Sequence, residues 1–344
     1  MKAMVMAAGA GTRLRPLTLA VPKPMVPVAN RPVLEYTLLN LKRHGITDIM
    51  LNLHAFPQMI RDYFQDGSRW GVNLHYSYEP KLLGTAGGVK KVESFLKGEP
   101  FLVMSGDGLT DTDLTAFMAF HRKKKSYASL VLKPIDSHFD YGVTFMNAAG
   151  RVQRFVEKPA WGDVFSNQVN AGIYLFEPDI FRHIPKNHFY DFGKQVWPKL
   201  LQLKKPVYGY VTPRYWCDIG NLQEYRRSQR DMLEHHLHFS LPGRAYKKGV
   251  RIGERTRIHP SVKLQSPCLI GDDCVIGAGT TIGAFTVIGH RAKIGRKAKI
   301  TNCVLWDDVS VERGVALENC IISQNARVRE NIFVYEGTVL DVNV

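Results

Sequence analysis

The residues best suited to phosphate chemistry lie close to the amino terminus. Gly9 and Gly11 follow an apolar run at residues 3–7, and Arg13 comes shortly after them. Glycines that follow a strand let backbone N–H groups approach a phosphate closely. Lys23 stands between two prolines, which stiffen the chain and hold its ammonium group at a defined place. We therefore predict a triphosphate-binding loop in which Arg13 and Lys23 are catalytic, because they neutralise charge that develops during the transfer.

This loop differs from the two best-known phosphate-binding motifs. Leu14 stands where the Rossmann dinucleotide fingerprint requires a third glycine, and no Gly-Lys-Ser/Thr sequence follows as it does in a P-loop. A Gly-x-Gly sequence after a strand is weak evidence when it is taken alone.

Two aspartates are candidate metal ligands. Asp107 follows an apolar run at residues 100–104 and is flanked by glycines, and Asp218 precedes Ile219-Gly220. Each has an ordinary structural alternative, a turn at Asp107 and a helix cap at Asp218, although Asn221 is the more natural cap. Because hard cations prefer carboxylate oxygens, we predict that Asp107 and Asp218 hold one Mg²⁺ ion.

The elements that must position these residues alternate between strands and helices up to about residue 240. We expect strands at residues 3–7, 48–53, 100–104 and 127–132, and helices at residues 32–44, 58–65, 114–124 and 221–238. This alternation predicts a Rossmann-like, wound α/β sheet of mostly parallel strands, with ligands at the carboxyl ends of the strands.

From residue 250 the sequence repeats every six residues. Nine aliphatic residues stand in perfect register, at positions 252, 258, 264, 270, 276, 282, 288, 294 and 300. A period of six fits neither a helix, at about 3.6, nor a simple strand, at about 2. It is typical of a left-handed parallel β-helix, so we predict two domains, an α/β domain at residues 1–240 and a β-helix at residues 241–344.

The β-helix has two further features. After Ile300 the register slips, and the sequence at residues 302–305 returns in similar form seventeen residues later, at 319–322. The chain reaches Val344 without an obvious polar cap, which would leave a sheet edge exposed. We expect either a longer natural chain or a partner to cover that edge, and a homo-oligomer formed through the β-helix is the expected assembly.

Composition limits the class of protein. The 344 residues are 45% hydrophobic and 22% charged, as in ordinary soluble proteins, and no apolar run approaches the ~20 residues of a membrane helix. Five cysteines without a Cys-x-x-Cys motif or a secretory signal indicate a reducing, cytoplasmic location without a membrane partner. We expect the cysteines of the β-helix to fill its interior, and His235, His236 and His238 to lie on an exposed linker helix instead of forming a metal site.

The net charge of +15 predicts polyanionic partners. Residues 1–243 carry 31 Lys+Arg against 21 Asp+Glu, and residues 244–344 carry 15 against 10. The larger excess therefore falls on the part of the chain that contains the phosphate loop. Phosphorylated substrates account for it, and a nucleic-acid partner is not required.

Seven ordered motifs of the first domain resemble the signature of the sugar-1-phosphate nucleotidyltransferases. They are Gly9–Leu14 with Pro22-Lys23-Pro24, Leu83-Gly84-Thr85-Ala86-Gly87, Gly106-Asp107, Tyr141-Gly142, Phe155-Val156-Glu157-Lys158-Pro159, Asn170-Ala171-Gly172 and Trp216–Gly220. The mannose-1-phosphate guanylyltransferase branch is the most similar, and a hexapeptide tail is also common in this family.

The resemblance implies a role for each matching residue. Nucleotide contacts would come from Ala8, Gly9, Gly11, Thr12, Arg13, Gly84, Thr85 and Gly87. The sugar phosphate would be held by Tyr141, Gly142, Glu157, Lys158 and Asn170. Asp107 and Asp218 would bind Mg²⁺, Arg13 would stabilise the leaving pyrophosphate, and Lys23 would contact the α-phosphate. The implied reaction is GTP with α-D-mannose 1-phosphate to GDP-mannose and pyrophosphate.

Three alternatives stay open at this point. Glucose 1-phosphate with dTTP, UTP or ATP is the first, because the sequence does not determine the base or the sugar. The second is an acyltransferase that works through the β-helix, although His259 and His290 lack an evident partner. The third is a non-catalytic regulatory subunit, which the complete set of charged site residues disfavours.

Overall fold

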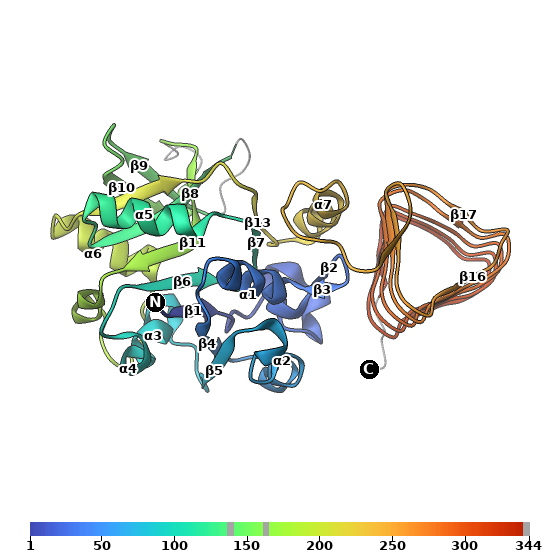
Figure 1. The fold of residues 1–344 in the computed structure, drawn as a ribbon, viewed down its shortest axis with the longest axis horizontal. Coiled ribbons are helices and arrows are strands. Elements are labelled where there is room, and N and C mark those ends of the chain that lie inside the picture. Colours follow the sequence, from blue (N-terminus) through green and yellow to red (C-terminus); the bar gives the residue numbers. More distant parts are fainter. Residues whose placement is uncertain (136–140, 161–164, 340–344) are drawn as a thin grey trace. The chain divides into compact units, whose positions relative to one another are not determined.

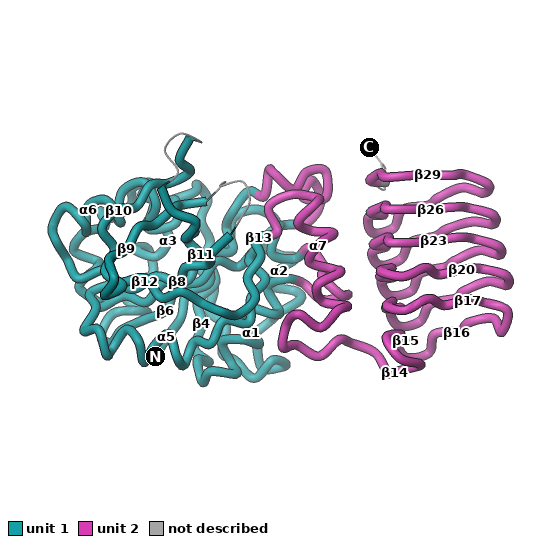
Figure 2. Tube along the Cα trace, turned by 90° about the horizontal axis from the view of Figure 1, so that it is seen from above, with its two compact units in different colours: residues 1–10, 22–25, 33–218 teal, residues 11–21, 26–32, 219–344 magenta. Residues whose placement is uncertain are grey.

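The structure is a computed structural model that describes residues 1–135, 141–160 and 165–339. The chain forms two compact units, and segments near the amino terminus belong alternately to one unit and the other (Figure 2). Unit 1 comprises Met1–Ala10, Pro22–Met25 and Val33–Asp218, and unit 2 comprises Gly11–Val21, Val26–Pro32 and Ile219–Val344. The division into domains at residues 1–240 and 241–344 stays a prediction.

Unit 1 is built on a nine-stranded sheet whose first half is parallel (Figure 1). Its strands are β5 (Asn73–Tyr78), β4 (Asp48–Leu53), β1 (Ala3–Met6) and β6 (Phe101–Ser105), hydrogen-bonded in that order. The central strands β1 and β6 are short, almost wholly buried apolar runs, which suits strands covered on both faces. The connecting helices are α1 (Val33–Arg43), α2 (Pro57–Phe64), α3 (Gly84–Lys91) and α4 (Glu93–Leu96).

The second half of the sheet is largely antiparallel, and of its strands the sequence pattern predicted only the one at residues 127–132. Strand β11 (Gln168–Phe176) pairs antiparallel with β6, β8 (Ala128–Pro134) and β9 (Gly142–Met146). The remaining elements are α5 (Leu114–Lys124), β10 (Val152–Glu157), α6 (Trp197–Gln202) and β12 (Val207–Val211). A separate ribbon joins β7 (Gly108–Thr110) to β13 (Trp216–Asp218). The aromatic core of this half centres on Phe176, Phe192 and Trp197, whose rings contact one another.

The predicted Rossmann-like class is confirmed, and most predicted elements agree with the structure within two residues. The strand at 48–53 and the helix at 114–124 have the predicted bounds. The helix predicted at 221–238 is α7 (Leu222–Leu233), which begins after an Asn221 cap and ends five residues early. It ends there because His235 adopts a left-handed backbone conformation, with a φ of 60°.

Unit 2 contains the predicted β-helix, whose coils are built from three sheets (Figure 1). Its aliphatic residues form a buried core. One sheet comprises β15 (Val250–Ile252), β18 (Cys268–Ile270), β21 (Thr286–Ile288), β24 (Val304–Leu305), β27 (Ile321–Ile322) and β30 (Thr338–Val339), with β14 (Arg244–Lys247) antiparallel at its edge. The second comprises β16 (Arg257–Ile258), β19 (Val275–Ile276), β22 (Lys293–Ile294), β25 (Ser310–Val311) and β28 (Arg327–Val328). The third comprises β17 (Lys263–Leu264), β20 (Thr281–Ile282), β23 (Lys299–Thr301), β26 (Ala316–Glu318) and β29 (Phe333–Tyr335).

The register of the strands explains the slip in the repeat. Ile270 pairs with Ile288, eighteen residues later, whereas Ile288 pairs with Leu305, seventeen residues later. A coil of three hexapeptides therefore gives way to a coil that is one residue shorter. Cys268, Cys274, Cys303 and Cys320 all lie in the apolar interior, as we predicted, and all are free thiols.

A buried hydrogen-bond chain connects the β-helix, α7 and a short hairpin of unit 2. The hairpin consists of β2 (Pro27–Val28) and β3 (Arg31–Pro32). The Trp306 indole N–H donates to the Tyr225 hydroxyl at 2.8 Å, and that hydroxyl donates to the Pro27 carbonyl at 2.7 Å. Tyr225 and Trp306 are both buried. Since an unpaired polar group is costly in such a place, this chain holds the three segments of unit 2 together.

In the part of the chain that the structure describes, none of the helices has the length and apolar character needed to cross a bilayer.

Replacing Tyr225 with Phe tests the hydrogen-bond chain. The Tyr225→Phe variant keeps the ring but leaves the buried Trp306 N–H without its acceptor, so we expect the free energy of unfolding to fall by about 1–3 kcal/mol. Urea denaturation followed by circular dichroism measures this change. Tyr246→Phe, on an exposed tyrosine of β14, is the matched control; equal stability of the two variants would contradict the assignment.

Candidate active site

A cavity of about 250 Å³ in unit 1 lies at the carboxyl ends of β1 and β6. Six residues predicted for the site line it, namely Ala8, Gly9, Lys23, Gly84, Thr85 and Asp107. The cavity is therefore where a wound α/β sheet is expected to bind its ligand. Asn52, Glu79, Leu82, Phe189 and Asp191 also line it and had not been predicted.

Lys23 lies between the two predicted metal ligands. Its ammonium group is 2.6 Å from Oδ2 of Asp107 and 2.8 Å from Oδ1 of Asp218. Asp107 lies two residues after the end of β6, and Asp218 is paired with Gly108 across the β7–β13 ribbon. The ribbon therefore brings two aspartates that are distant in sequence to the same cation.

Burial and neighbouring charges shift the pKa values of Lys23 and Asp107 in opposite directions. Burial lowers the pKa of Lys23, but the attraction of Asp107 and Asp218 outweighs it, and the pKa lies above its usual value. Burial raises the pKa of Asp107, yet the Lys23 ammonium and hydrogen bonds, including one from Ser105, hold that pKa below its usual value. Lys23 and Asp107 are consequently both charged near neutral pH.

Two carboxylates that converge on one cation are a suitable donor set for a divalent metal ion. Hard cations such as Mg²⁺ take carboxylate oxygens and usually keep several water ligands. The geometry of Asp107 and Asp218 fits such an ion, which would compete with the Lys23 ammonium for the same oxygens.

A second polar group holds the first loop against the loop that precedes α3. Asn52 accepts a hydrogen bond from the Ala7 amide at 2.8 Å and donates one to Oε1 of Glu79 at 2.8 Å. The other oxygen of Glu79 accepts from the Leu83 amide at 3.0 Å. Asn52 and Glu79 are both buried, so these bonds form in a poorly solvated place where they are strong.

Glycines allow α3 to approach the loop at residues 188–190. A Cβ atom on Gly84 would lie 2.5 Å from the Tyr190 carbonyl oxygen, and one on Gly87 would lie 2.6 Å from that of His188. Gly84 also has a φ of +74°, which favours glycine. Thr85 fastens the contact, since its hydroxyl donates to Asp191 at 2.8 Å and accepts from the Phe192 amide at 2.8 Å. The Leu-Gly-Thr-Ala-Gly motif is therefore required for close packing at the wall of the cavity.

The residues predicted to bind the sugar phosphate come from three neighbouring strands. Gly142 on β9 pairs with Glu157 on β10, and the Lys158 amide donates to the Tyr141 carbonyl at 3.2 Å. Asn170 lies on β11, the next strand of the sheet, where it accepts from the Gly172 amide at 3.0 Å and donates to the Tyr174 hydroxyl at 2.8 Å. The structure thus gathers these five residues, and their contact with a sugar phosphate stays a prediction.

Glu157 is in an unfavourable place for a charged group. Burial raises its pKa above the usual value, and the neighbouring carboxylate of Asp191 raises it further, against the opposite effect of Lys158 and Lys194. Cβ atoms on Gly142 and Gly193 would lie 2.8 and 2.3 Å from one of its oxygens, so two glycines leave room for this carboxylate. Carboxylates whose pKa is raised by burial and by a neighbouring negative charge are typical of functional sites.

Gly11, Thr12 and Arg13 belong to unit 2, unlike the other predicted nucleotide-binding residues. Gly11 has a φ of 62° and begins a short 3₁₀ helix, Thr12–Leu14. The Thr18 hydroxyl donates to the Gly11 carbonyl at 2.8 Å, which closes the loop on itself. The loop is an ordered turn, and the predicted triphosphate contacts of Arg13 stay a prediction.

Signals for the unpredicted cavity residues were present but weak. Asn52 is a polar residue in an otherwise apolar run, and Glu79 follows a strand directly. Asp191 caps the turn of π-helix Phe192–Val196, with its carboxylate accepting from the Gly193 and Lys194 amides. Such positions are common outside active sites, so only their convergence on one cavity distinguishes them.

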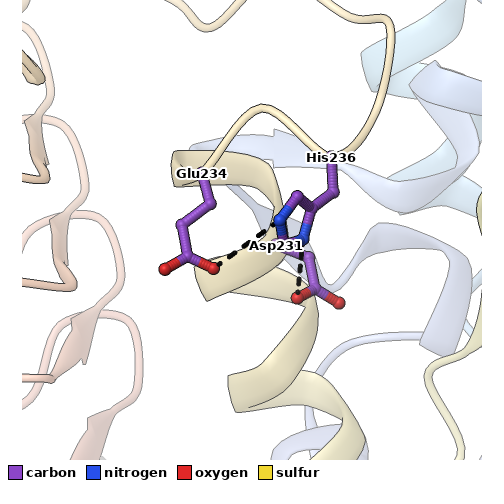
Figure 3. A group of neighbouring side chains, drawn as sticks. All are labelled: Asp231, Glu234 and His236. Atoms are coloured by element: carbon purple, nitrogen blue, oxygen red, sulfur yellow. Dashed lines mark hydrogen bonds and ion pairs between the residues drawn. The ribbon is translucent and has the colours of Figure 1, made fainter.

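Asp231, Glu234 and His236 form a cluster at the end of α7 that could hold a metal ion (Figure 3). His236 lies 3.4 Å from Asp231 through Nδ1 and 4.0 Å from Glu234 through Nε2. The ring thus faces the two carboxylates with different nitrogens, whereas one ion would be bound by a single nitrogen. We interpret the cluster as polar contacts between neighbouring side chains at a helix end.

Comparison with known proteins identifies the family to which the chain belongs. The family described as "Nucleotidyl transferase" matches residues 2–235, and the "EIF2B subunit epsilon LbH domain" matches residues 247–344. The chain therefore belongs to the nucleotidyl transferase family and is an enzyme of that family. The predicted left-handed β-helix is confirmed by the second match.

Individual relatives share most of the chain. It is 36% identical over 304 residues to UTP–glucose-1-phosphate uridylyltransferase of Synechocystis sp., which is 79% of this chain and 78% of that protein. It is 30% identical over 344 residues to mannose-1-phosphate guanylyltransferase 1 of Arabidopsis thaliana, which is 98% of this chain and 86% of that protein. A solved structure from Bacillus anthracis, named as a putative glucose-1-phosphate thymidylyltransferase, shares the fold with a TM-score of 0.63 at 22% identity, covering 70% of this chain and 97% of that one.

The raised pKa of Glu157 predicts a gain in stability when its charge is removed. A carboxyl whose folded pKa is raised destabilises the fold once pH exceeds its unfolded pKa, near 4.5 here. Glu157→Gln should therefore raise the free energy of unfolding at pH 7, and the gain should disappear as pH falls below about 4.5. Urea denaturation at pH 4 and pH 7 measures both values. Glu254→Gln, at an exposed position, should show no such pH dependence, and a gain at pH 7 shared by both variants would refute this explanation.

Proposed function

We propose that this protein transfers the guanylyl group of GTP to α-D-mannose 1-phosphate and releases pyrophosphate, which yields GDP-mannose. The observation that carries the proposal is the Lys23 ammonium held between Asp107 and Asp218 at a cavity in a nucleotidyltransferase fold. Support for the substrates comes from relatives named mannose-1-phosphate guanylyltransferases, which match nearly the whole chain.

The proposed reaction needs cations and positioning more than proton transfer. A sugar phosphate is already a nucleophile at neutral pH, so no general base is required. The task is to bring two polyanions together and to align the attack on the α-phosphorus opposite the leaving pyrophosphate. In this proposal Lys23 neutralises charge at the α-phosphate and Arg13 stabilises the pyrophosphate. Asp107 and Asp218 would hold Mg²⁺, which would supply Lewis-acid stabilisation of the phosphate charge.

Glu79 supports guanine as the base. Its carboxylate lines the cavity and receives one hydrogen bond on each oxygen, from Asn52 and from Leu83. A carboxylate has about four acceptor positions, so two remain for a ligand. Guanine presents two adjacent N–H donors, N1–H and the 2-amino group, which suit a carboxylate, whereas uracil and thymine present one ring N–H between two carbonyls.

The sugar phosphate would occupy the side of the site that β9, β10 and β11 form. Glu157 would accept hydrogen bonds from sugar hydroxyls, and Lys158, which is exposed beside it, would bind the phosphate. The Tyr141-Gly142 and Asn170–Gly172 segments would surround the sugar. Their placement on adjacent strands supports this assignment.

A second candidate is the transfer of a uridylyl group from UTP to glucose 1-phosphate. The relative from Synechocystis, named for that reaction, is 36% identical, a higher value than the 30% of the Arabidopsis relative, but over 79% of this chain instead of 98%. The two candidates share the same residues for phosphate transfer and differ in the base and the sugar.

Location and assembly complete the proposal. The five free, buried cysteines are compatible with the reducing environment of the cytoplasm.

We propose further that copies of the chain associate through the β-helix. Ile332, Phe333 and Tyr335, which lie in its last coil, are exposed apolar side chains that a second copy would cover.

Pyrophosphate release measured for each nucleotide with each sugar 1-phosphate tests the proposed function. We expect GTP with mannose 1-phosphate to give the highest kcat/KM among GTP, UTP, dTTP, ATP and CTP paired with mannose 1-phosphate or glucose 1-phosphate. An enzyme that prefers UTP with glucose 1-phosphate would establish the second candidate. Release of no pyrophosphate from any pair would overturn both.

Replacing Lys23 tests the proposed metal site independently of turnover. In Lys23→Met, Asp107 and Asp218 lose the ammonium that competes for their oxygens, so Mg²⁺ should bind more tightly while kcat falls by about tenfold or more. Isothermal titration with Mg²⁺ and the release assay measure the two effects. The exposed Lys81→Met variant is the control for loss of one positive charge. Weaker Mg²⁺ binding in Lys23→Met than in this control would count against the shared site.

A further inference from the structure

Two exposed apolar side chains lie at the wall of a cavity that is otherwise lined by many polar groups. Phe189 is 62% exposed and Leu82 is 39% exposed, and both line the cavity that contains Lys23 and Asp107. Exposure of this much apolar surface is unfavourable in water. Its position at the wall of a ligand-sized cavity indicates that a ligand covers it.

The two side chains are carried by loops that are fastened to each other. The Tyr190 amide donates to the Leu83 carbonyl at 2.9 Å, so the residues next to Phe189 and Leu82 are directly paired. The Tyr190 carbonyl in turn accepts from the amides of Ala86 and Gly87, at 2.9 and 3.0 Å. Thr85 adds its bonds to Asp191 and Phe192. The backbone beside Phe189 and Leu82 is therefore held in place before a ligand arrives, which reduces the entropy lost on binding.

The chemistry of the cavity divides it into two parts. Lys23, Asp107 and Ser105 form a charged part that suits phosphate groups and a cation. Glu79, Leu82 and Phe189 offer a single buried acceptor group beside apolar surface. A flat, apolar face with hydrogen-bonding groups on its edge is the shape of a nucleobase.

We infer that Phe189 stacks on the nucleobase and that Leu82 packs against it, so that these two residues position the base while Glu79 contacts its edge. This inference rests on the proposed function for the presence of a nucleotide. An aromatic side chain stacked on a base contributes enough that its removal weakens binding by roughly tenfold or more. The contact is made by the π-face of the base, so it applies to GTP and to UTP.

Binding measurements on the full chain test the inference without requiring turnover. In Phe189→Ala and in Leu82→Ala, we expect the Kd for GTP to rise, by about tenfold for Phe189→Ala, while the Kd for inorganic tripolyphosphate stays unchanged. Phe189→Tyr should keep the wild-type affinity. Phe145→Ala is the matched control, because Phe145 is 46% exposed on β9 and is not among the residues that line the cavity.

Three outcomes would overturn the inference. An equal loss for GTP and tripolyphosphate would indicate a general disturbance of the site, and unchanged GTP binding would exclude stacking. An increase in KM for the sugar 1-phosphate alone would assign Phe189 to the sugar. If GTP and mannose 1-phosphate prove to be the wrong substrates, the same comparison with UTP still tests the stacking, so the two proposals fail separately.

Discussion

The contact of Lys23 with Asp107 and Asp218 is the interaction on which the site depends. Lys23 Nζ lies within 2.8 Å of oxygens from two aspartates that are 84 and 195 residues away in the sequence. Burial of three charged groups is unfavourable in itself, and their mutual attraction offsets it only while the geometry is good. The β7–β13 ribbon and the carboxyl end of β6 supply that geometry. A bound metal ion would change which cation satisfies the two carboxylates, and it would leave Lys23 available for a phosphate.

A second constraint is close packing between loops that are distant in the sequence. Gly84 and Gly87 let α3 approach the loop at residues 188–190, and the Asn52–Glu79 pair joins the first loop to the loop that precedes α3. Rigid loops of this kind position Leu82, Glu79 and Phe189 around one cavity before the substrate binds. Preorganisation reduces the entropy lost on binding. It also lowers the stability of the fold where a carboxylate such as Glu157 is kept partly buried beside Asp191.

The β-helix contributes in a different way, through repetition. Each coil stacks its aliphatic residues on those of the coil before, and the shortening from eighteen to seventeen residues per coil is absorbed without loss of the sheet register. Unit 2 also includes Gly11–Val21 and Val26–Pro32, which flank Lys23 in the sequence. The bonds from Trp306 to Tyr225 and from Tyr225 to Pro27 join the β-helix to the second of these segments. The β-helix is thus connected to the segment that follows Lys23.

The sequence by itself determined the features that depend on local order. The six-residue period predicted the β-helix, and alternating strands and helices led to the correct class of sheet, including the helix Leu114–Lys124 with its bounds. The motifs also singled out Lys23, Asp107 and Asp218 as charged residues of a phosphate or metal site. The tertiary structure alone decided that these three meet, that β8 to β11 form a largely antiparallel half, and that Asn52, Glu79, Asp191 and Phe189 join the cavity. The physical reason is that periodicity and turn chemistry act between near neighbours, whereas the convergence of side chains depends on tertiary contacts between segments that are up to 195 residues apart.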